Sequence, residues 1–179
     1  MPDRIPALIV SGTVGAGKTT IAEEISVLFE ELSIRHLWLD LDALAQVYPR
    51  SPDDPYNQRL MFANLAAVWV NVKPRAPEYV VMACVVESPE ELPLYKAAIP
   101  EADFTVVRVI ASSTTIEPRL HGREVGLYFD TMWARSQELA GILDATAIEA
   151  FTVNNDGRPV REVAIEVLTK LGWAYPTTR

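Results

Sequence analysis

Cysteine and long apolar runs are both nearly missing from this chain of 179 residues. The single cysteine, Cys84, excludes an internal disulfide bond and a cysteine-rich zinc site. Because Cys84 lies in the apolar run from Tyr79 to Val86, we expect it to be a small buried hydrophobe. That run is far shorter than the roughly 20 residues that span a membrane. Pro6 interrupts the apolar residues near the start, so we expect no signal peptide. We therefore expect a cytoplasmic protein that binds no membrane.

Positive charge is also scarce. The 24 acidic residues outnumber the 16 basic ones, so the formal net charge is −8. Nucleic acids are bound through basic surfaces, so we expect no nucleic-acid partner. Twelve of the basic residues are arginine and only four are lysine. Arginine suits bidentate contacts with phosphate or carboxylate groups. Every basic residue between positions 101 and 140 is an arginine, namely Arg108, Arg119, Arg123 and Arg135.

Apolar runs of strand length alternate with amphipathic stretches along the chain. The expected strands are Ile5 to Val10, His36 to Leu39, Tyr79 to Val86, Phe104 to Ile110 and Phe151 to Val153. The expected helices are Thr19 to Ser33, Tyr56 to about Val72, Ser88 to Ala98, Thr131 to Leu143 and Val160 to Leu171. Residues 113–130 are expected to begin as a helix and continue as a loop. This alternation predicts an α/β fold in which helices cover both faces of a parallel sheet.

The segment Gly12–Thr19 matches the P-loop pattern GxxxxGK[ST] between an apolar strand and an amphipathic helix. Its glycines allow a tight turn whose backbone amides cradle phosphate oxygens, and the next helix offers its positive N-terminus. We expect Lys18 to contact the β- and γ-phosphates and the Thr19 hydroxyl to bind Mg²⁺. The residues expected to hold the nucleotide phosphates are Gly12, Val14, Gly15, Ala16, Gly17, Lys18, Thr19 and Thr20.

Two acidic residues, Asp40 and Asp42, follow the second expected strand. Ligands of parallel sheets bind at the carboxyl ends of the strands, so both carboxylates can face one site. We expect Asp40 to help hold Mg²⁺ and Asp42 to accept a proton from a substrate hydroxyl. The alternative use of the pair is to cap the next helix, which would start at Ala43.

Arg119 and Arg123 are four residues apart and would share one helix face. Together with Arg135 on the next helix, they could form a lid that neutralises transferring phosphate and excludes water. The alternative is that Arg119 and Arg123 are solvated charges paired with Glu117 and Glu124.

These motifs, in this order, resemble the P-loop nucleotide and small-molecule kinases, such as the shikimate, gluconate, adenylylsulfate and nucleoside-monophosphate kinases. The DxxG and NKxD elements of switch GTPases are absent. The resemblance spans nearly the whole chain and implies one domain, residues 1–179, folded as a three-layer sandwich. It implies a five-stranded parallel sheet in the order 2-3-1-4-5, with ATP and Mg²⁺ as ligands. It also implies an acceptor-binding segment over about 43–75, a small lid over about 116–130 and Asn155 in a turn beside adenine.

The sequence departs from these kinases after the third expected strand. An acid of the Walker B type would end that strand, but the chain reads Met-Ala-Cys-Val-Val-Glu from Met82 to Glu87. Glu87 is therefore a candidate Mg²⁺ ligand, and a surface residue that opens the next helix is the equal alternative.

Candidate acceptor-binding residues are Trp38, Asp42, Tyr56 and Arg59. Trp38 could stack on a flat acceptor, although an aromatic near a strand end also suits the core. Arg59 could hold an anionic group or lie on the surface. Arg108 is expected inside a strand, where its charge must be paired, and Asp40, Asp42 or a nucleotide are the expected partners.

The sequence thus predicts an ATP-dependent phosphotransferase that acts on a hydroxyl or phosphate of a small molecule. The alternative is a nucleotide-binding sensor or assembly partner with weak or no kinase activity. We expect a monomer or a homodimer.

Overall fold

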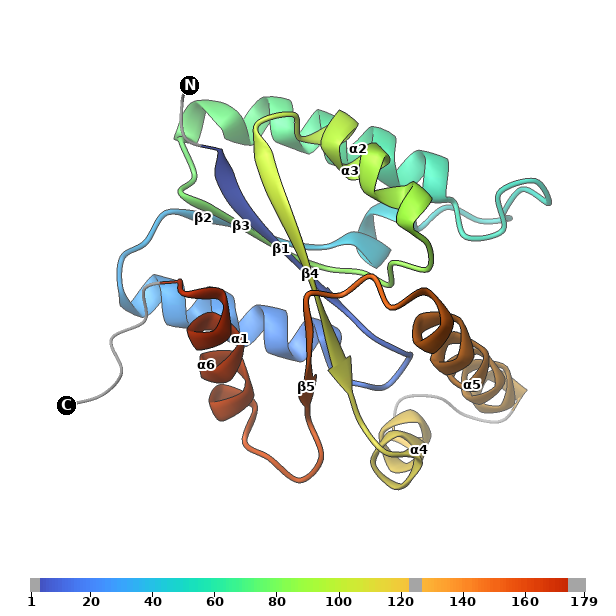
Figure 1. The fold of residues 1–179 in the computed structure, drawn as a ribbon. Helices are drawn as coiled ribbons and strands as arrows, with labels where there is room; N and C mark the ends of the chain where they lie inside the picture. Colours follow the sequence, from blue (N-terminus) through green and yellow to red (C-terminus); the bar gives the residue numbers. More distant parts are fainter. Residues whose placement is uncertain (1–3, 123–126, 174–179) are drawn as a thin grey trace.

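The computed structural model describes residues 4–122 and 127–173, which surround a five-stranded sheet (Figure 1). Its strands are β1 (Ile5–Ser11), β2 (His36–Asp40), β3 (Tyr79–Ala83), β4 (Ala102–Ile110) and β5 (Phe151–Asn154). Every neighbouring pair is parallel, and the spatial order is β2-β3-β1-β4-β5. The expected α/β class and strand order are therefore confirmed.

Helices form a layer on each face of the sheet (Figure 1). They are α1 (Lys18–Glu31), α2 (Gln58–Val72), α3 (Leu92–Ala98), α4 (Ser113–His121), α5 (Leu127–Thr146) and α6 (Val160–Leu171). Three short 3-10 helices are η1 (Leu41–Ala45), η2 (Lys73–Arg75) and η3 (Pro89–Glu91). The helices α1 and α6 cover one face, and α2 and α3 cover the other. The helices α4 and α5 lie side by side near the carboxyl end of β4.

The central strand β1 supplies both layers of the core. Ala7 and Ile9 pack on the side of α2 and α3, whereas Leu8 and Val10 pack on the side of α1 and α6. All four side chains are fully buried. A continuous apolar run is therefore the pattern that a strand covered on both faces requires.

Several element boundaries differ from the expectation: α5, for example, begins at Leu127 and not at Thr131. Two of the differences, at α2 and α3, have local reasons. The helix expected from Tyr56 begins at Gln58, because Asn57 adopts the left-handed conformation with φ 52°. The helix expected over Ser88 to Ala98 is divided into η3 and α3, where Pro93 stands in the first turn of α3. Proline donates no backbone hydrogen bond, so it is accommodated in a first turn and not inside a helix.

The strand expected to reach Val86 ends at Ala83. The chain then remains attached to β1, because Cys84 N donates to Val10 O and Val86 N donates to Ser11 Oγ at 3.1 Å. The Ser11 hydroxyl thus replaces a backbone acceptor and lets the chain turn away from the sheet.

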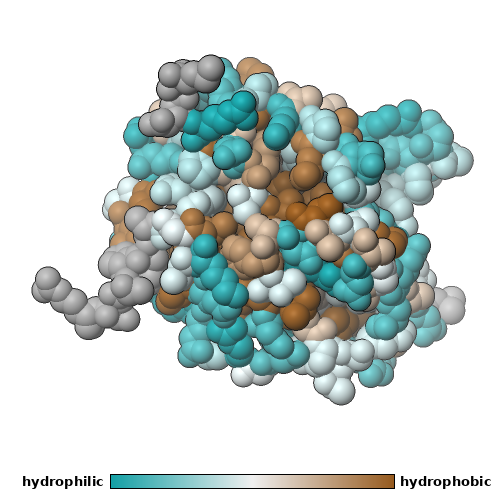
Figure 2. Space-filling model, viewed as in Figure 1, coloured by the Kyte–Doolittle hydropathy of each residue, from teal (hydrophilic) through white to brown (hydrophobic). Residues whose placement is uncertain are grey.

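The loop over residues 46–57, between η1 and α2, projects from the body at the upper right of Figure 1. Its side chains are mostly exposed. Figure 2 shows this projection as one of the most hydrophilic parts of the visible surface. It borders the carboxyl end of the sheet, where the functional motifs gather.

Candidate functional site

The P-loop connects the carboxyl end of β1 to the first turn of α1. Gly12, Gly15 and Gly17 have φ angles of 146°, 80° and 102°, which other residues rarely adopt. A Cβ at Gly12 would lie 2.4 Å from the carbonyl oxygen of Val109, so the loop passes close against β4. Since α1 begins at Lys18, the loop ends at the amides of a helix N-terminus, which favour an anion.

Two of the predicted residues brace this loop from its outer side. Asn155 Nδ2 donates to Ala16 O at 2.8 Å. Arg119 Nη1 donates to Gly15 O at 3.3 Å and to Ala16 O at 3.1 Å, and its Nη2 donates to Asn155 O at 3.2 Å. Arg119 therefore holds carbonyl groups of the loop and brings a positive charge beside it, a role that the lid hypothesis did not include.

Lys18 is nearly buried and its Nζ donates to Thr13 O at 3.0 Å. The ammonium group thus lies across the P-loop from its own helix. A phosphate in the loop would exchange this neutral acceptor for charged ones, which bind an ammonium group more strongly.

The hydroxyl of Thr19 donates to Oδ2 of Asp40 at 3.1 Å. The other oxygen of Asp40, Oδ1, accepts from Asp42 N at 3.0 Å and caps η1. Asp40 therefore meets Thr19 and also caps η1, which begins at Leu41 and not at the expected Ala43.

The pair formed by Thr19 and Asp40 fits a magnesium ion. No cluster of three or more His, Cys, Asp or Glu that could hold a metal occurs within residues 4–122 and 127–173. Mg²⁺ does not need such a cluster, since it keeps several waters and uses one or two protein oxygens when it also binds phosphates. A hydroxyl and a carboxylate beside the P-loop meet that requirement.

A cavity of about 560 Å³ opens between four segments. They are the P-loop, η1, helix α5 and the loop that precedes α2. Such a volume is typical of small-molecule sites. Its polar and charged lining consists of Asp42, Gln46, Arg50, Asp53, Asp54, Tyr56, Gln58, Glu87, Ser88, Glu91 and Arg135. Its apolar lining consists of Val14, Ala45, Pro55, Met61, Cys84, Val85, Met132 and Leu139. The cavity brings together five predicted site residues from separate segments: Val14, Asp42, Tyr56, Glu87 and Arg135.

Asp42 has an exposed side chain that lines this cavity. Loss of solvation raises the pKa of Asp42, the Lys18 ammonium opposes that shift, and the nearby Asp40 carboxylate adds to it. A carboxylate with a raised pKa is a stronger base than an ordinary aspartate, which suits a group that accepts a proton.

Arg135, on α5, also lines this cavity. It pairs with Glu87 and with Glu138, and its guanidinium lies 4.8 Å from the ring centroid of Tyr56. Glu87, the candidate metal ligand, is thus engaged by Arg135. The neighbouring Ser136 is buried and donates to Val14 O at 2.9 Å, which ties α5 to the P-loop. Sequence analysis missed Ser136, because an isolated serine in a helix carries no signal.

A second cavity of about 380 Å³ lies on the other side of the P-loop. Its lining combines loop glycines with α4 and the turn after β5, and consists of Gly15, Gly17, Thr20, Pro118, Arg119, Gly122, Asn155 and Val160. The P-loop therefore separates two hollows, each bordered by residues that the sequence singled out.

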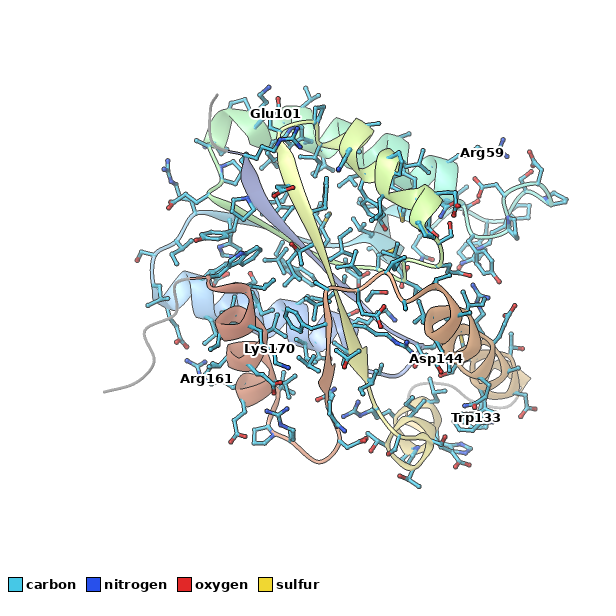
Figure 3. The ribbon with its side chains drawn as sticks, viewed as in Figure 1. Arg59, Glu101, Trp133, Asp144, Arg161 and Lys170 are labelled. Carbon is cyan, nitrogen blue, oxygen red and sulfur yellow. The ribbon has the colours of Figure 1, made fainter. Side chains whose placement is uncertain are left out.

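The structure does not bring Trp38 and Arg59 into the first cavity. Trp38 packs against the core beneath α1 and α6, on the opposite face of the sheet. Arg59 lies at the start of α2 beside the projecting loop (Figure 3) and pairs with Asp53 and Asp54. These contacts correspond to the core and surface alternatives for the two residues. Arg123 lies outside the described residues.

The expectation that Arg108 pairs with Asp40 or Asp42 is wrong. Arg108 is buried on β4 and pairs with Asp144 at 2.7 Å and with Glu149 at 3.6 Å. Asp144 is on α5, on the side toward β4 (Figure 3). The side chain of Arg108 therefore points to the segment before β5, away from Asp40 and Asp42. The expected burial of Cys84 is confirmed, and burial raises the pKa of its thiol to about 12.

The fold is shared with solved structures of small-molecule kinases. A sugar kinase from Janibacter is similar at a TM-score of 0.61 and 19% identity, over 97% of this chain and 96% of that one. An APS kinase from Mycobacterium tuberculosis, in complex with AMPPNP and APS, is similar at 0.62 and 20%, over 96% and 99%. The tunicamycin resistance protein of Deinococcus radiodurans is similar at 0.63 and 14%, over 96% and 98%. No family model matches the sequence, and no curated protein matches it.

The chain thus has the fold of the P-loop small-molecule kinases. Within the described ranges, no helix is both long and apolar enough to cross a membrane.

Proposed function

We propose that this protein transfers the γ-phosphoryl group of ATP to a hydroxyl or phosphate group of a small molecule. The observation that carries the proposal is the cavity of about 560 Å³ that adjoins the P-loop, with Asp42 in its lining. A loop for the donor phosphates next to a separate cavity is the arrangement that phosphoryl transfer between two small molecules requires. The kinases that share this fold support the same reaction class.

In this proposal the donor lies along the P-loop. Lys18 and the loop amides bind its phosphates, and the second cavity, between Arg119 and Thr20, takes the nucleoside. Asn155 and Arg119 hold the loop in shape. Thr19 and Asp40 would hold Mg²⁺, which when bound neutralises charge on the transferring phosphate.

The acceptor occupies the first cavity, with its nucleophilic oxygen toward the P-loop. Asp42 accepts the proton of an attacking hydroxyl while the new oxygen–phosphorus bond forms and ADP leaves. Arg135 and Tyr56 form the wall that excludes water from the acceptor. Glu87 and Glu138 hold the guanidinium group of Arg135, so in this proposal Lys18 supplies the positive charge beside the transferring group.

The pairing of Glu87 with Arg135 favours a second candidate function, a nucleotide-binding protein with weak or no transfer activity. Glu87, the candidate acid after β3, is thus paired, and Asp40 is the acid that contacts Thr19.

ADP formation separates the two candidates. The protein is incubated with Mg²⁺ and ATP, with and without pools of small hydroxyl compounds, and ADP is measured. Acceptor-dependent ADP formation that is lost in Lys18→Ala supports the kinase. Lys96→Ala, on the exposed side of α3, is the matched control and should retain activity. Tight ADP binding without ADP formation from any pool would support the binding protein.

A further inference from the structure

We propose that the acceptor is a polyhydroxyl compound that carries an amine and no phosphate, sulfate or carboxylate group. This inference rests on the proposed function, because it assigns a chemical class to the acceptor of the same cavity. It is carried by the charges of the lining, by the partners that those charges already have, and by the apolar part of the cavity.

Negative charge predominates in the cavity. Its described lining includes five carboxylates and two guanidinium groups. The carboxylates belong to Asp42, Asp53, Asp54, Glu87 and Glu91, and the guanidinium groups to Arg50 and Arg135. An anionic acceptor would lose its hydration in a space of the same sign as itself, which is unfavourable.

The two arginines already have partners within the protein: carboxylates for Arg135 and two neutral oxygens for Arg50. Arg135 is held by Glu87 and by Glu138 and lies against the ring of Tyr56. Recognition of phosphate or carboxylate by arginine normally uses a fork of free donors, and here carboxylates of the protein already occupy it. Arg50 donates to Pro55 O at 3.3 Å and to the hydroxyl of Tyr48 at 3.2 Å.

Three of the five carboxylates have arginine partners. Asp53 and Asp54 both pair with Arg59, which lies outside the cavity lining, and Glu87 pairs with Arg135. The Ser51 hydroxyl and Arg59 lower the pKa of Asp53 to about 2, so that this carboxylate stays charged.

The remaining two carboxylates, Asp42 and Glu91, are in none of the arginine ion pairs found among the described residues, although the charges of Lys18 and Arg50 act on Asp42. Glu91 is nearly buried, and its Oε1 accepts from the backbone amides of Glu87 and Ser88 at 2.9 and 3.2 Å. Asp42 lies at the P-loop side of the cavity. A ligand ammonium group would add a charge-assisted donor to these acceptors, and neighbouring ligand hydroxyls could donate to Gln46 or Gln58.

The rest of the lining is apolar and suits the hydrocarbon face of a ring. Met61, Cys84 and Leu139 are buried residues of this part. The phosphates of a bound donor would add further negative charge beside the P-loop. Both features favour an amino sugar or aminocyclitol over an acidic metabolite.

The proposal can be tested by binding, separately from turnover. The protein, saturated with Mg²⁺ and a non-hydrolysable ATP analogue, is titrated by calorimetry with glucosamine, glucose, gluconate and glucose 6-phosphate, and with the larger amine kanamycin. We expect at least one amine to bind about tenfold or more tightly than the neutral and anionic compounds. Anions that bind as tightly as the amines, or an absence of binding by both amines, would overturn the proposal.

A second binding experiment adds a positive charge to the lining of the cavity. Gln58 lines the cavity, whereas Gln137 lies on α5 with an exposed side chain outside the lining. Gln58→Lys should weaken amine binding about tenfold, and Gln137→Lys, which changes the net charge equally, should leave it unchanged. Equal effects of the two variants would contradict a local charge preference.

Failure of the reaction and failure of the specificity give different results. An amine that binds tightly but yields no ADP with ATP retains the acceptor class and removes the kinase. ADP formation with an anionic acceptor retains the kinase and removes the acceptor class.

Discussion

The hydroxyl of Thr19 donates a hydrogen bond to the carboxylate of Asp40 at 3.1 Å and thereby joins the start of α1 to the end of β2. The two residues are 21 positions apart in the chain. Because β3 separates β2 from β1 in the sheet, the contact exists only at the carboxyl edge, where the ends of the strands converge on the P-loop. The sheet order therefore creates the candidate magnesium site.

Removal of the hydroxyl tests this site. We expect Thr19→Ala to reduce ADP formation roughly 100-fold or more, the loss that is typical when one electrostatic contact of a transition state is removed. The required Mg²⁺ concentration should rise. Unfolding in urea should change by only about 1 kcal/mol, because one hydrogen bond is lost. Thr19→Ser keeps the hydroxyl and should keep most of the activity. Full activity of Thr19→Ala across a Mg²⁺ titration would contradict the assignment.

The brace behind the P-loop predicts a loss of both stability and nucleotide affinity. Asn155→Ala removes the donor to Ala16 O at a buried position and should lower the free energy of unfolding by about 1–3 kcal/mol. ADP should bind more weakly, because the loop loses a contact that fixes its shape. Asn71→Ala is the control, since Asn71 makes a similar 2.8 Å bond to Ala67 O on an exposed helix surface. Equal destabilisation by both variants, measured in urea, would argue against a special role for the brace.

Two glycines predict opposite effects of the same substitution. At Gly17 the φ angle is 102° and a new Cβ would lie 2.4 Å from Asn155 Nδ2, so Gly17→Ala should destabilise the fold and abolish nucleotide binding. Gly141 is inside α5 with open space around it, so Gly141→Ala should stabilise the protein by about 1 kcal/mol. Thermal unfolding with and without ADP measures both effects. A stable, ADP-binding Gly17→Ala protein would show that the loop can rearrange.

The sequence was sufficient to predict the fold, because its apolar runs and its P-loop motif point to the same arrangement of strands and helices. The runs of β1 and β3 are apolar throughout, which only a strand covered on both faces requires, and the P-loop fixes the connection from β1 to α1. The ends of elements were less predictable. Asn57 begins α2 through two bonds from its amide to Ala45 O and Val47 O, and no local pattern reveals such distant partners.

The candidate site was predictable where a short sequence motif determines the local backbone structure. It was less predictable where the position of a side chain depends on residues far away in the chain. Thr19 and Asp40 lie in short motifs next to strand ends and meet through a hydrogen bond, and Lys18 lies in the P-loop motif beside Thr19. The placements of Trp38 and Arg108 depend on which face of the sheet each side chain takes. The aromatic and charged character of these residues suggested a ligand, but tertiary neighbours, such as Asp144 for Arg108, account for them instead.

The raised pKa of Asp42 predicts opposite effects of one variant on stability and on activity. Loss of solvation is the main cause, so native Asp42 keeps its proton at pH values where the unfolded chain has lost it. Stability therefore falls as pH rises from the ordinary aspartate value of 3.8 through the higher native pKa. Asp42→Asn should be more stable than the natural chain at pH 7, and the difference should vanish below pH 3.8.

The same variant should lose activity if Asp42 accepts the acceptor's proton. In the natural chain, kcat/KM should fall on the acid side at a pH above the ordinary aspartate range, because protonated Asp42 is no longer a base. Urea unfolding at pH 7 and pH 3.5, together with a pH–rate profile, measures both effects. A less stable Asp42→Asn protein at pH 7 would contradict the desolvation that the cavity imposes.

The buried charge of Arg108 predicts a stability effect without a direct catalytic one. Arg108→Ala would leave Glu149, which is only 11% exposed, without its cation, and removal of one partner of a buried pair typically costs about 3–5 kcal/mol. The exposed pair of Arg35 and Glu78 is the control, because its loss should cost less than about 1 kcal/mol. At a temperature where Arg108→Ala remains folded, the KM for ATP should be close to that of the natural chain, since Arg108 points away from Asp40 and Asp42. A large rise in that KM, with the fold intact by circular dichroism, would contradict this prediction and indicate that Arg108 contributes to nucleotide binding.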